Sequence, residues 1–408
     1  MATASKQSVG GGSTGKKTGR NGTGKMEIYL DNAATTKVES EVVELMNRIF
    51  TEDYGNPSSL HKIGYRAEQY ISEALNVFSG KLKWKRKNVV FTSGGTESNN
   101  TALIGAALFR ESRGKHIITT MIEHPSVSEP LGFLESRGWE VEKAGVNKDG
   151  VIDPEELKSR IRPDPVLVSV MHVNNETGSI QPVEEVGKLI KDANSECFFH
   201  VDDIQGFGKL PLNAAKAHID LLTASSHKLH GPKGVGLLYL SDIATHIKPL
   251  MYGGGQQNGL RSGTINVPGI AGFAKAAELI FKEREESFER VSKLREGFVY
   301  EVQNIEDVKV NGGKSASPYI VSLTVRGVRS EVMLHALEDR GIYVSAGSAC
   351  SSHKKHVSPT LKAIGLSDEE AEETIRLSFN RHNSEEEAAY TIAALKELIP
   401  SLRRFKRR

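Results

Sequence analysis

The sequence predicts an α/β fold, in which helices cover a mostly parallel β-sheet, followed by a smaller α+β domain. Three observations support this prediction. Short apolar, β-rich runs alternate with segments of helical length. Glycine and polar residues follow directly after several of these runs, and a long charge-rich helical pattern begins near residue 273. At 408 residues and 38% hydrophobic content, the chain is long enough to bury a large core and to form two domains.

The alternation is clearest in the first 240 residues. Five runs have the composition of buried strands, and these are Asn88–Thr92, His116–Thr120, Val166–Val170, Cys197–Val201 and Val235–Tyr239. Helical patterns separate them, which is typical of a parallel sheet covered on both faces. We therefore expect a large domain over residues 26–272, with its first ~20 residues packing toward the second domain.

The second domain, residues 273–408, is predicted to be smaller. A long helix is expected from Phe273 to about Val302, and a strand over Ser317–Val325. A helix near Glu331–Arg340, a loop that contains Cys350 and a last helix from Ser384 to Leu398 complete it.

The ends and the charge of the chain exclude some classes of protein. The first 25 residues are rich in Gly, Ser, Thr and Lys and lack the apolar run of a secretory signal, so we interpret them as a disordered or appended tail rather than an organelle address. The formal net charge is +2; this tail holds five basic residues and no acid, which leaves the rest at −3. No run of about 20 apolar residues is present. We expect neither a membrane span nor nucleic acid as the main ligand.

Cysteine usage predicts the compartment. Cys197 and Cys350 are the two cysteines, too few for a disulfide framework and without metal-ligand spacing. A reducing compartment, the cytoplasm, is the natural interpretation, and no metal is expected. Cys197, at the start of an apolar strand, is interpreted as a core residue.

Polar residues converge where the predicted strands end. Gly94-Gly95-Thr96 follows the first strand, Glu123-His124 the second, Asn174-Asn175 the third and Asp202 the fourth. In parallel sheets, ligands bind beyond the carboxyl ends of the strands. We expect these residues to share one site, whereas His200, on the strand of Asp202, is expected to pack or cap.

The segment Thr92–Asn100 resembles an anion cradle, because two glycines lead from a strand into a helix whose first amides point outward. A plain helix cap at Ser93 or Thr96 is the alternative. No Gly-Lys-Ser/Thr follows and no G-x-G-x-x-G is present, which weakens nucleotide-binding interpretations.

Three further residues suggest chemistry on the sulfur of an amino acid. Lys228, among His and Gly/Pro turn residues, is able to form a Schiff base with an aldehyde cofactor. Asp202, at a strand end, can pair with a pyridinium nitrogen. Cys350, among small residues, is a candidate nucleophile. Each alone is weak evidence, because most lysines are solvated and most lone cysteines are small core residues.

The ordered motifs resemble those of the cysteine desulfurases, pyridoxal-phosphate (PLP) enzymes of the class V aminotransferase, fold type I, group. The resemblance runs from Met26 to about Leu398. It covers Tyr29–Thr36, Gly55–His61, Gly94–Asn100, Glu123-His124, Asn174–Gly178, Ser225–Gly234, Arg261–Thr264, Gly347–Cys350 and Ile375-Arg376. It implies a seven-stranded, mostly parallel sheet in the large domain, and a homodimer.

The resemblance also implies roles for individual residues. Lys228 would carry PLP, His124 would stack on the ring and shuttle protons, and Cys350 would form the persulfide. The expected cofactor-binding residues are Gly95, Thr96, Asp202, Gln205, Ser225, His227, Lys228 and, from the neighbouring subunit, Thr264. Asn175, Arg376 and Asn32 are expected to bind the substrate, with an arginine fork suited to its carboxylate. The implied reaction converts L-cysteine to L-alanine and passes sulfur to a protein acceptor, for iron–sulfur clusters, thio-cofactors or thiolated tRNA.

The sequence departs from the family pattern at two places. The first, Asp203, is expected to affect function little, and the second, a basic run after Cys350, concerns the sulfur acceptor. Asp203 follows Asp202 where a small residue is usual, and strand alternation should point its carboxylate away from the ring, so Asp203→Ala should keep the cofactor. The basic run His353–His356 after Cys350 is either a solvated loop or a cluster that favours the thiolate and an acidic acceptor. The longer C-terminal extension of scaffold-feeding members is not apparent after Leu398.

A selenocysteine lyase or a class V aminotransferase of the same fold remains the alternative, and in an aminotransferase Cys350 would have no role. A cofactor-binding scaffold without turnover is disfavoured by Lys228, His124 and Cys350 together.

Overall fold

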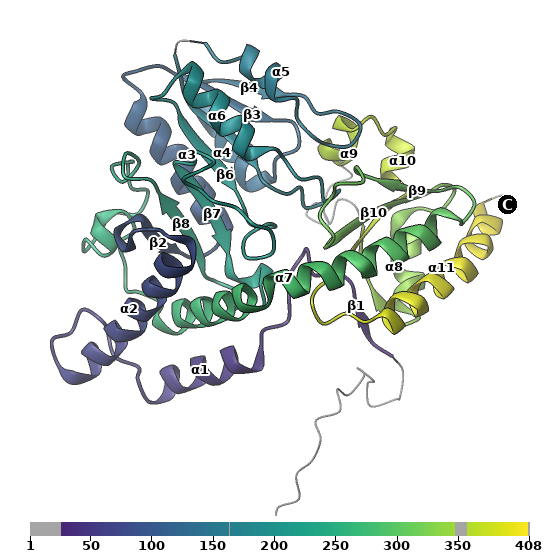
Figure 1. Ribbon diagram of the computed structural model, residues 1–408, viewed down its shortest axis with the longest axis horizontal. Helices are drawn as coiled ribbons and strands as arrows, with labels where there is room; N and C mark the ends of the chain where they lie inside the picture. The colour runs from purple at the N-terminus through teal and green to yellow at the C-terminus, as the bar shows by residue number, and fades with distance from the viewer. Residues whose placement is uncertain (1–25, 163, 347–356, 407–408) are drawn as a thin grey trace, which may run out of the picture.

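A computed structural model of the chain describes residues 26–162, 164–346 and 357–406. Two lobes are joined by one long helix (Figure 1). The large lobe is built on a seven-stranded sheet, and the small lobe on a four-stranded sheet. Cys350 and the basic run 353–356 lie outside the described residues.

The seven-stranded sheet is mostly parallel, as predicted. Its order is β2 (Val89–Thr92), β8 (Gly236–Leu240), β7 (Leu221–Ser225), β6 (Phe198–Asp202), β5 (Pro165–Met171), β3 (His116–Thr120) and β4 (Glu140–Ala144). β8 alone runs in the direction opposite to the other six strands. The five expected strands are present within one residue at each end. β4 and β7 were not anticipated individually, and β4 is a polar edge strand whose side chains are largely accessible.

Helices cover both faces of this sheet because neighbouring strand residues point to opposite sides. Phe198 packs with α3 (Gly95–Arg110) and α4 (Pro125–Glu135), in a cluster that includes Leu103 and Leu131. Phe199 packs on the opposite face, in a cluster with Phe78 of α2 (Lys62–Leu82) and Ile190 of α6 (Val183–Ala193). The sheet is therefore buried on both sides.

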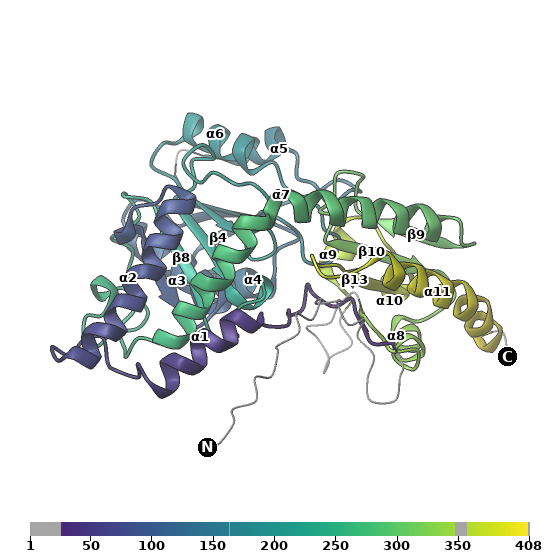
Figure 2. The same cartoon turned by 60° about the horizontal axis from the view of Figure 1, so that its bottom comes forward.

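Helix α7 (Val267–Gln303) belongs to both lobes (Figure 2). Phe273 and Ile280 lie in the core of the large lobe, whereas Val291 and Phe298 lie in the core of the small lobe. Its 37 residues span about 55 Å at 1.5 Å per residue. The helix begins six residues before the predicted start. The prediction missed its first turns because they are apolar and buried and lack the charge pattern on which the prediction was based.

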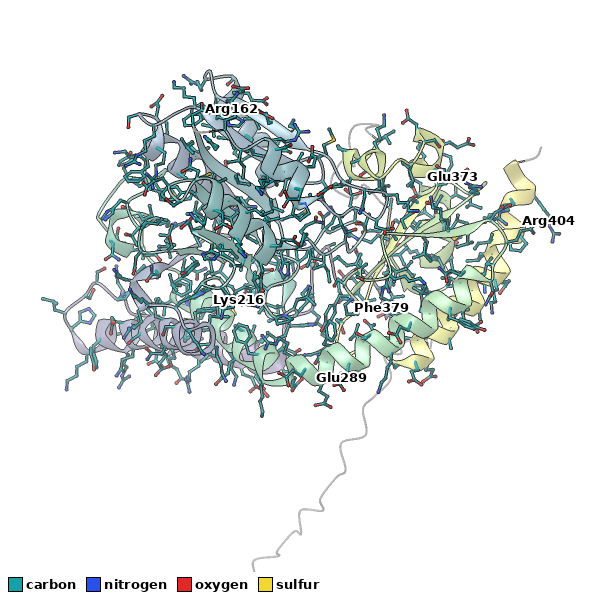
Figure 3. All side chains as sticks on the ribbon, turned by 45° about the horizontal axis from the view of Figure 1, so that its top comes forward. Arg162, Lys216, Glu289, Glu373, Phe379 and Arg404 are labelled. Carbon is teal, nitrogen blue, oxygen red and sulfur yellow. The ribbon has the colours of Figure 1, made fainter. Side chains whose placement is uncertain are left out.

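The small lobe has an antiparallel sheet in the order β12 (Ser345–Ala346), β13 (Thr374–Ser378), β10 (Ile320–Val325) and β9 (Val308–Asn311). Helices α8 (Ser330–Glu338) and α11 (Glu385–Lys406) pack on it. Phe379, labelled in Figure 3, follows β13 and its ring lies 5.5 Å from that of Phe298 of α7.

The first described residues join the small lobe. Strand β1 (Ile28–Tyr29) pairs in parallel with β11 (Ile342–Tyr343), and Ile28 and Leu30 lie in the small-lobe core. The remaining elements are α1 (Ser40–Thr51), α5 (Pro154–Ser159), α9 (Pro359–Ala363), α10 (Asp368–Glu372), η1 (Arg86–Asn88), η2 (Ser226–Lys228) and η3 (Gln257–Gly259). Among the described residues, no helix has the length and apolar character needed to span a membrane.

Candidate active site

The strand ends converge as the sequence predicts. β2, β7, β6, β5 and β3 run in the same direction, so their carboxyl ends meet at one edge of the sheet. This edge of the sheet faces the small lobe, and α7 runs from the large lobe to the small lobe (Figure 1). The residues that follow these strands therefore surround one site.

An anion cradle lies at the end of β2. Gly94 has φ +154° and ψ −178°, a conformation that favours glycine, and Gly95 begins α3. A Cβ at Gly95 would lie 2.3 Å from Ile204 Cδ1, so a larger residue here would have to displace the end of that side chain. A cavity of about 380 Å³ opens here, and it is lined by Thr35, Ser93, Gly94, Gly95, Thr96, Glu97, Ser225, His227, Lys233 and Gly234.

The polar groups around this cavity suit a phosphate. Backbone amides at the first turn of α3 point outward, where the helix dipole favours an anion. Glu97, the acid in the lining, is paired with Arg261 at 2.8 Å (Oε1 to Nε). Burial, helped by nearby lysines, lowers the pKa of His227 to about 4, so its imidazole is neutral at pH 7. Ser225 is buried, and its Oγ has no hydrogen-bond partner among the described residues.

Asp202 is held in a buried network of the large lobe. Its Oδ2 accepts a 2.9 Å hydrogen bond from Asn99 Nδ2, and its Oδ1 accepts one of 3.0 Å from the Ile204 amide. Asn99 also donates to Ser126 Oγ at 2.8 Å and accepts from Thr223 Oγ1 at 2.6 Å. Burial raises the pKa of Asp202, while these donors and the charges of His124 and Lys228 oppose that rise. The carboxylate is fixed before any ligand arrives.

Asp203 has different partners, as strand alternation predicts. Its Oδ1 lies 2.7 Å from His172 Nδ1, and both residues are buried. A Cβ at Gly206 would come within 2.3 Å of Asp203 Oδ1 and 2.6 Å of His172 Nδ1, so glycine makes room for this pair. The two adjacent carboxylates thus serve separate networks.

Lys228 closes the short helix η2 directly after β7. Its Nζ donates to the carbonyl oxygens of Ala33 (2.6 Å) and Ala34 (2.8 Å), in the segment that leaves the small lobe. Gln205 Nε2 donates to the same Ala33 oxygen at 2.9 Å, and Gln205 Oε1 is buried without a partner among the described residues. One carbonyl therefore brings Lys228 and Gln205 together.

His124 caps helix α4. Its Nδ1 accepts from the Ser126 amide at 3.1 Å, so in the neutral imidazole the proton is on Nε2. Burial lowers the pKa of His124; the Asp202 charge opposes this, and the Lys228 and Arg376 charges add to it. Asp202 ends β6, Lys228 follows β7 and Arg376 lies on β13, so charges from both lobes act on this ring.

Arg376 comes from the small lobe, on β13, and is 4% exposed. Its Nη1 donates to the Asn175 carbonyl at 2.9 Å, and its Nη2 donates to Asp31 Oδ1 (2.9 Å) and Ser345 Oγ (3.1 Å). Its Nε is buried without a partner among the described residues. A buried guanidinium with an unused donor suits an incoming carboxylate.

Asn32 helps to join the lobes. Its Nδ2 donates to the Ser378 carbonyl at 2.7 Å, and its Oδ1 accepts from Asn380 Nδ2 at 2.6 Å. Both groups of its amide are therefore used within the protein.

Within the residues that the structure describes, two of the predicted site residues are not found at this site. Thr264 is exposed and follows Arg261, which pairs with Glu97, by three residues. Cys350 lies outside the described residues. The predictions for two other residues are confirmed: Cys197 is buried in the core, and His200 is buried and bonded to Ser169 Oγ at 2.8 Å.

Four residues of this region were not singled out from the sequence for a role of their own: Asn99, Glu123, Glu176 and Lys209. Burial raises the pKa of Glu123 to about 8 and that of Glu176 to about 7, and lowers the pKa of Lys209 to about 7. Asn99 follows Thr96 by three residues, a helical spacing that could have indicated it. Glu123 was expected at the site from its position after a strand, whereas for Glu176 and Lys209 the sequence holds no comparable signal, because their burial arises from tertiary packing.

Comparison with known proteins agrees with this geometry. The "Aminotransferase class-V" family model matches residues 28–390. A cysteine desulfurase IscS of Dictyoglomus turgidum is 42% identical over 381 residues, which cover 93% of this chain and 96% of the relative. A solved NifS-like protein superposes with a TM-score of 0.87 at 38% identity, over 92% of this chain and 100% of its own. The structure of "SspA in complex with cysteine" does so with a TM-score of 0.78 at 34% identity, over 88% and 100%.

The chain therefore belongs to the class-V aminotransferase family, which confirms the fold type I prediction. Within that family it belongs with the cysteine desulfurases, as its motifs indicate. Members of both groups are PLP enzymes.

Proposed function

We propose that the protein is a PLP-dependent cysteine desulfurase that takes sulfur from L-cysteine, releases L-alanine and holds the sulfur on Cys350 as a persulfide. The observation that carries the proposal is the convergence of Lys228, Asp202, His124 and Arg376 at one sheet edge, beside an anion cradle. Sequence identity of 42% to a cysteine desulfurase over 93% of the chain supports it.

The residues present fit PLP. The cradle at Gly94-Gly95-Thr96 and the unused Ser225 Oγ would hold the phosphate, and the unused Gln205 Oε1 points to a further polar group of a ligand. Asp202 would hold the protonated ring nitrogen, and Lys228 would hold the cofactor covalently. When bound, PLP withdraws the electrons left at Cα after proton loss.

The protein's own groups then bind the substrate and move protons. Arg376, whose guanidinium is fixed by Asn175 and Asp31, would bind the substrate carboxylate. Lys228 Nζ would accept the Cα proton. His124, with its proton on Nε2 and its Nδ1 accepting from the Ser126 amide, would donate from Nε2 to the substrate sulfur, and the thiol proton of the substrate would leave to solvent.

Cys350 would act as the nucleophile. Its thiolate would form an S–S bond with the substrate sulfur while the substrate Cβ–S bond breaks, and a proton would replace sulfur on the carbon fragment, which leaves as alanine. A protein acceptor would then receive the sulfane sulfur. This chemistry needs a reduced thiol, which supports a cytoplasmic location.

A homodimer would complete the site. Large apolar side chains are exposed on and between α1 and α2, at Phe50, Tyr54, Leu60 and Tyr65, and the exposed Thr264 is expected to reach a partner's phosphate. Exposed patches of this kind mark protein–protein contacts.

The two cysteines give a matched test. Purified protein is incubated with L-cysteine and a reductant, and alanine and sulfide are measured. Cys350→Ala should lose most sulfide production, whereas Cys197→Ala, a core substitution, should keep it. Sulfide production that persists in Cys350→Ala would favour a lyase, and aminotransfer without sulfide would favour an aminotransferase.

A further inference from the structure

Glu176 makes a polar contact that the chemistry described above does not use. It lies in the turn after β5, and its Oε2 accepts a 2.6 Å hydrogen bond from Ser358 Oγ. Ser358 is buried and caps helix α9, because its Oγ accepts from the Leu361 amide at 3.2 Å. A hydroxyl has one hydrogen, so that of Ser358 is committed to Glu176.

The main chain around Glu176 is fixed on the same turn. Asn174 Oδ1 accepts from the amides of Glu176 and Thr177, both at 2.9 Å. The Gly178 carbonyl accepts from the Ser317 amide of the small lobe at 2.8 Å. The turn 174–178 is therefore held from within and also touches the small lobe.

This turn supports the expected substrate site. The Asn175 carbonyl, one residue before Glu176, accepts the 2.9 Å hydrogen bond from Arg376 Nη1. The charge of Arg376 also acts on Glu176 and opposes the effect of burial on its pKa. The turn 174–178 thus contacts α9 through the Glu176 carboxyl and Arg376 through the Asn175 carbonyl.

Helix α9 needs this contact to keep its place. Its apolar contacts form a small separate cluster, in which Leu361 and Ile364 pack with Val146 of the large lobe. The helix has only five residues, too short to be stable by itself. The hydrogen bond from Ser358 to Glu176 supplies its polar attachment to the turn.

We infer that Glu176 is a positioning residue for substrate binding: by holding Ser358, it keeps the turn 174–178 in the conformation in which the Asn175 carbonyl orients Arg376. This inference rests on the proposed function, since Arg376 is expected there to bind the substrate carboxylate. Without Glu176, the guanidinium would lose a fixed partner, and amino-acid binding would weaken while the phosphate cradle is unchanged.

The test uses full-length, PLP-loaded protein and titrates it with L-alanine, which has the carboxylate and amine of the expected product and needs no desulfuration. Binding is followed by the cofactor absorbance. Glu176→Ala should raise the L-alanine dissociation constant roughly tenfold, the scale of one lost buried hydrogen bond. Glu176→Gln keeps an acceptor oxygen and should stay within about twofold of wild type. PLP content should be unchanged in both.

Two further variants separate positioning from general destabilisation. Ser358→Ala should weaken L-alanine binding, and its effect should not add to that of Glu176→Ala, because both remove the same contact. If Glu176→Ala fails to fold, Ser358→Ala provides the test in its place. Glu370→Ala removes an acid that caps the nearby helix α10 and should leave binding unchanged.

Three results would overturn the inference: unchanged L-alanine affinity in Glu176→Ala or Ser358→Ala, equal losses in the Gln and Ala variants, or PLP loss in parallel with L-alanine affinity. A wild-type protein that binds L-alanine yet makes no sulfide from L-cysteine would contradict the proposed function instead. The two failures are therefore distinguishable.

Discussion

The wall of the site that the seven-stranded sheet provides is held by side chains of one lobe, whereas the interlobe wall carries Arg376, which bonds Asp31 and Ser345 of the small lobe and the Asn175 carbonyl of the large lobe. Asp202, Asn99, Thr223 and Ser126 bond one another within the large lobe. Arg376 depends on Asn175 and on Asp31, which lie in two other parts of the chain. The comparison teaches that the side proposed to hold the cofactor is preorganised within one lobe, while the side proposed to hold the substrate is tied to both lobes.

The largest expected effect is on the sheet wall. Asp202→Asn should lower desulfurase turnover by about 10²- to 10³-fold, because a neutral amide cannot stabilise the protonated ring nitrogen. Turnover and PLP content are measured together. Asp203→Asn is the matched control, since that carboxylate pairs with His172, and it should keep most activity. Equal losses in the two variants would contradict the assignment.

The interlobe wall should respond in substrate binding instead. Arg376→Lys keeps the charge but loses the guanidinium fork, and should raise KM for L-cysteine by about 10- to 100-fold with PLP content unchanged. Steady-state kinetics and cofactor absorbance check this. Loss of PLP in this variant would show that the two walls are not separable.

The sheet wall should also be less stable at high pH. Burial raises the pKa of Glu123 to about 8, so the stability from its protonated form is fully present below about 4.5 and is lost as the pH rises through about 8. Glu123→Gln imitates the protonated form. Urea unfolding should show the variant more stable than wild type by roughly 1–3 kcal/mol at pH 8.5 and similar at pH 5. A constant difference across this range would contradict the prediction.

The smallest effect on stability is expected for a carboxylate between the lobes. Its contribution is lost at low pH, whereas that of Glu123 is lost at high pH. Hydrogen bonds from His382 (2.6 Å) and Arg381 (2.8 Å) lower the pKa of Glu39 to about 2 against the effect of burial. The stability from its carboxylate is present above about 4.5 and is lost as the pH falls through about 2. Glu39→Gln should cost roughly 1–2 kcal/mol at pH 7, with a smaller difference at pH 3.5. Urea unfolding measures this, and a difference that grows at low pH would contradict it.

Sequence reasoning succeeded where the signal is local. Apolar runs at β3 and β6, the Gly94-Gly95 pair and the strand-end residues His124 and Asp202 each carry their information within a few neighbouring residues. Their meeting at one edge follows from the parallel sheet.

Sequence reasoning failed where packing between distant segments determines a contact or the burial of a residue. Nothing near Glu176 in the sequence shows that Ser358, 182 residues away, reaches its carboxyl. Likewise, Lys209 resembles a surface lysine until the fold buries it. The start of α7 was missed because its first turns lack the charged face of the rest.

The most direct test of the central claim is to trap the cofactor. Protein reconstituted with PLP is reduced with borohydride and digested, and the peptides are analysed by mass spectrometry. The account predicts a phosphopyridoxyl group on the peptide that contains Lys228. Lys209 is the rival amine, because burial lowers its pKa to about 7. A label on Lys209, or no label on Lys228, would contradict the account.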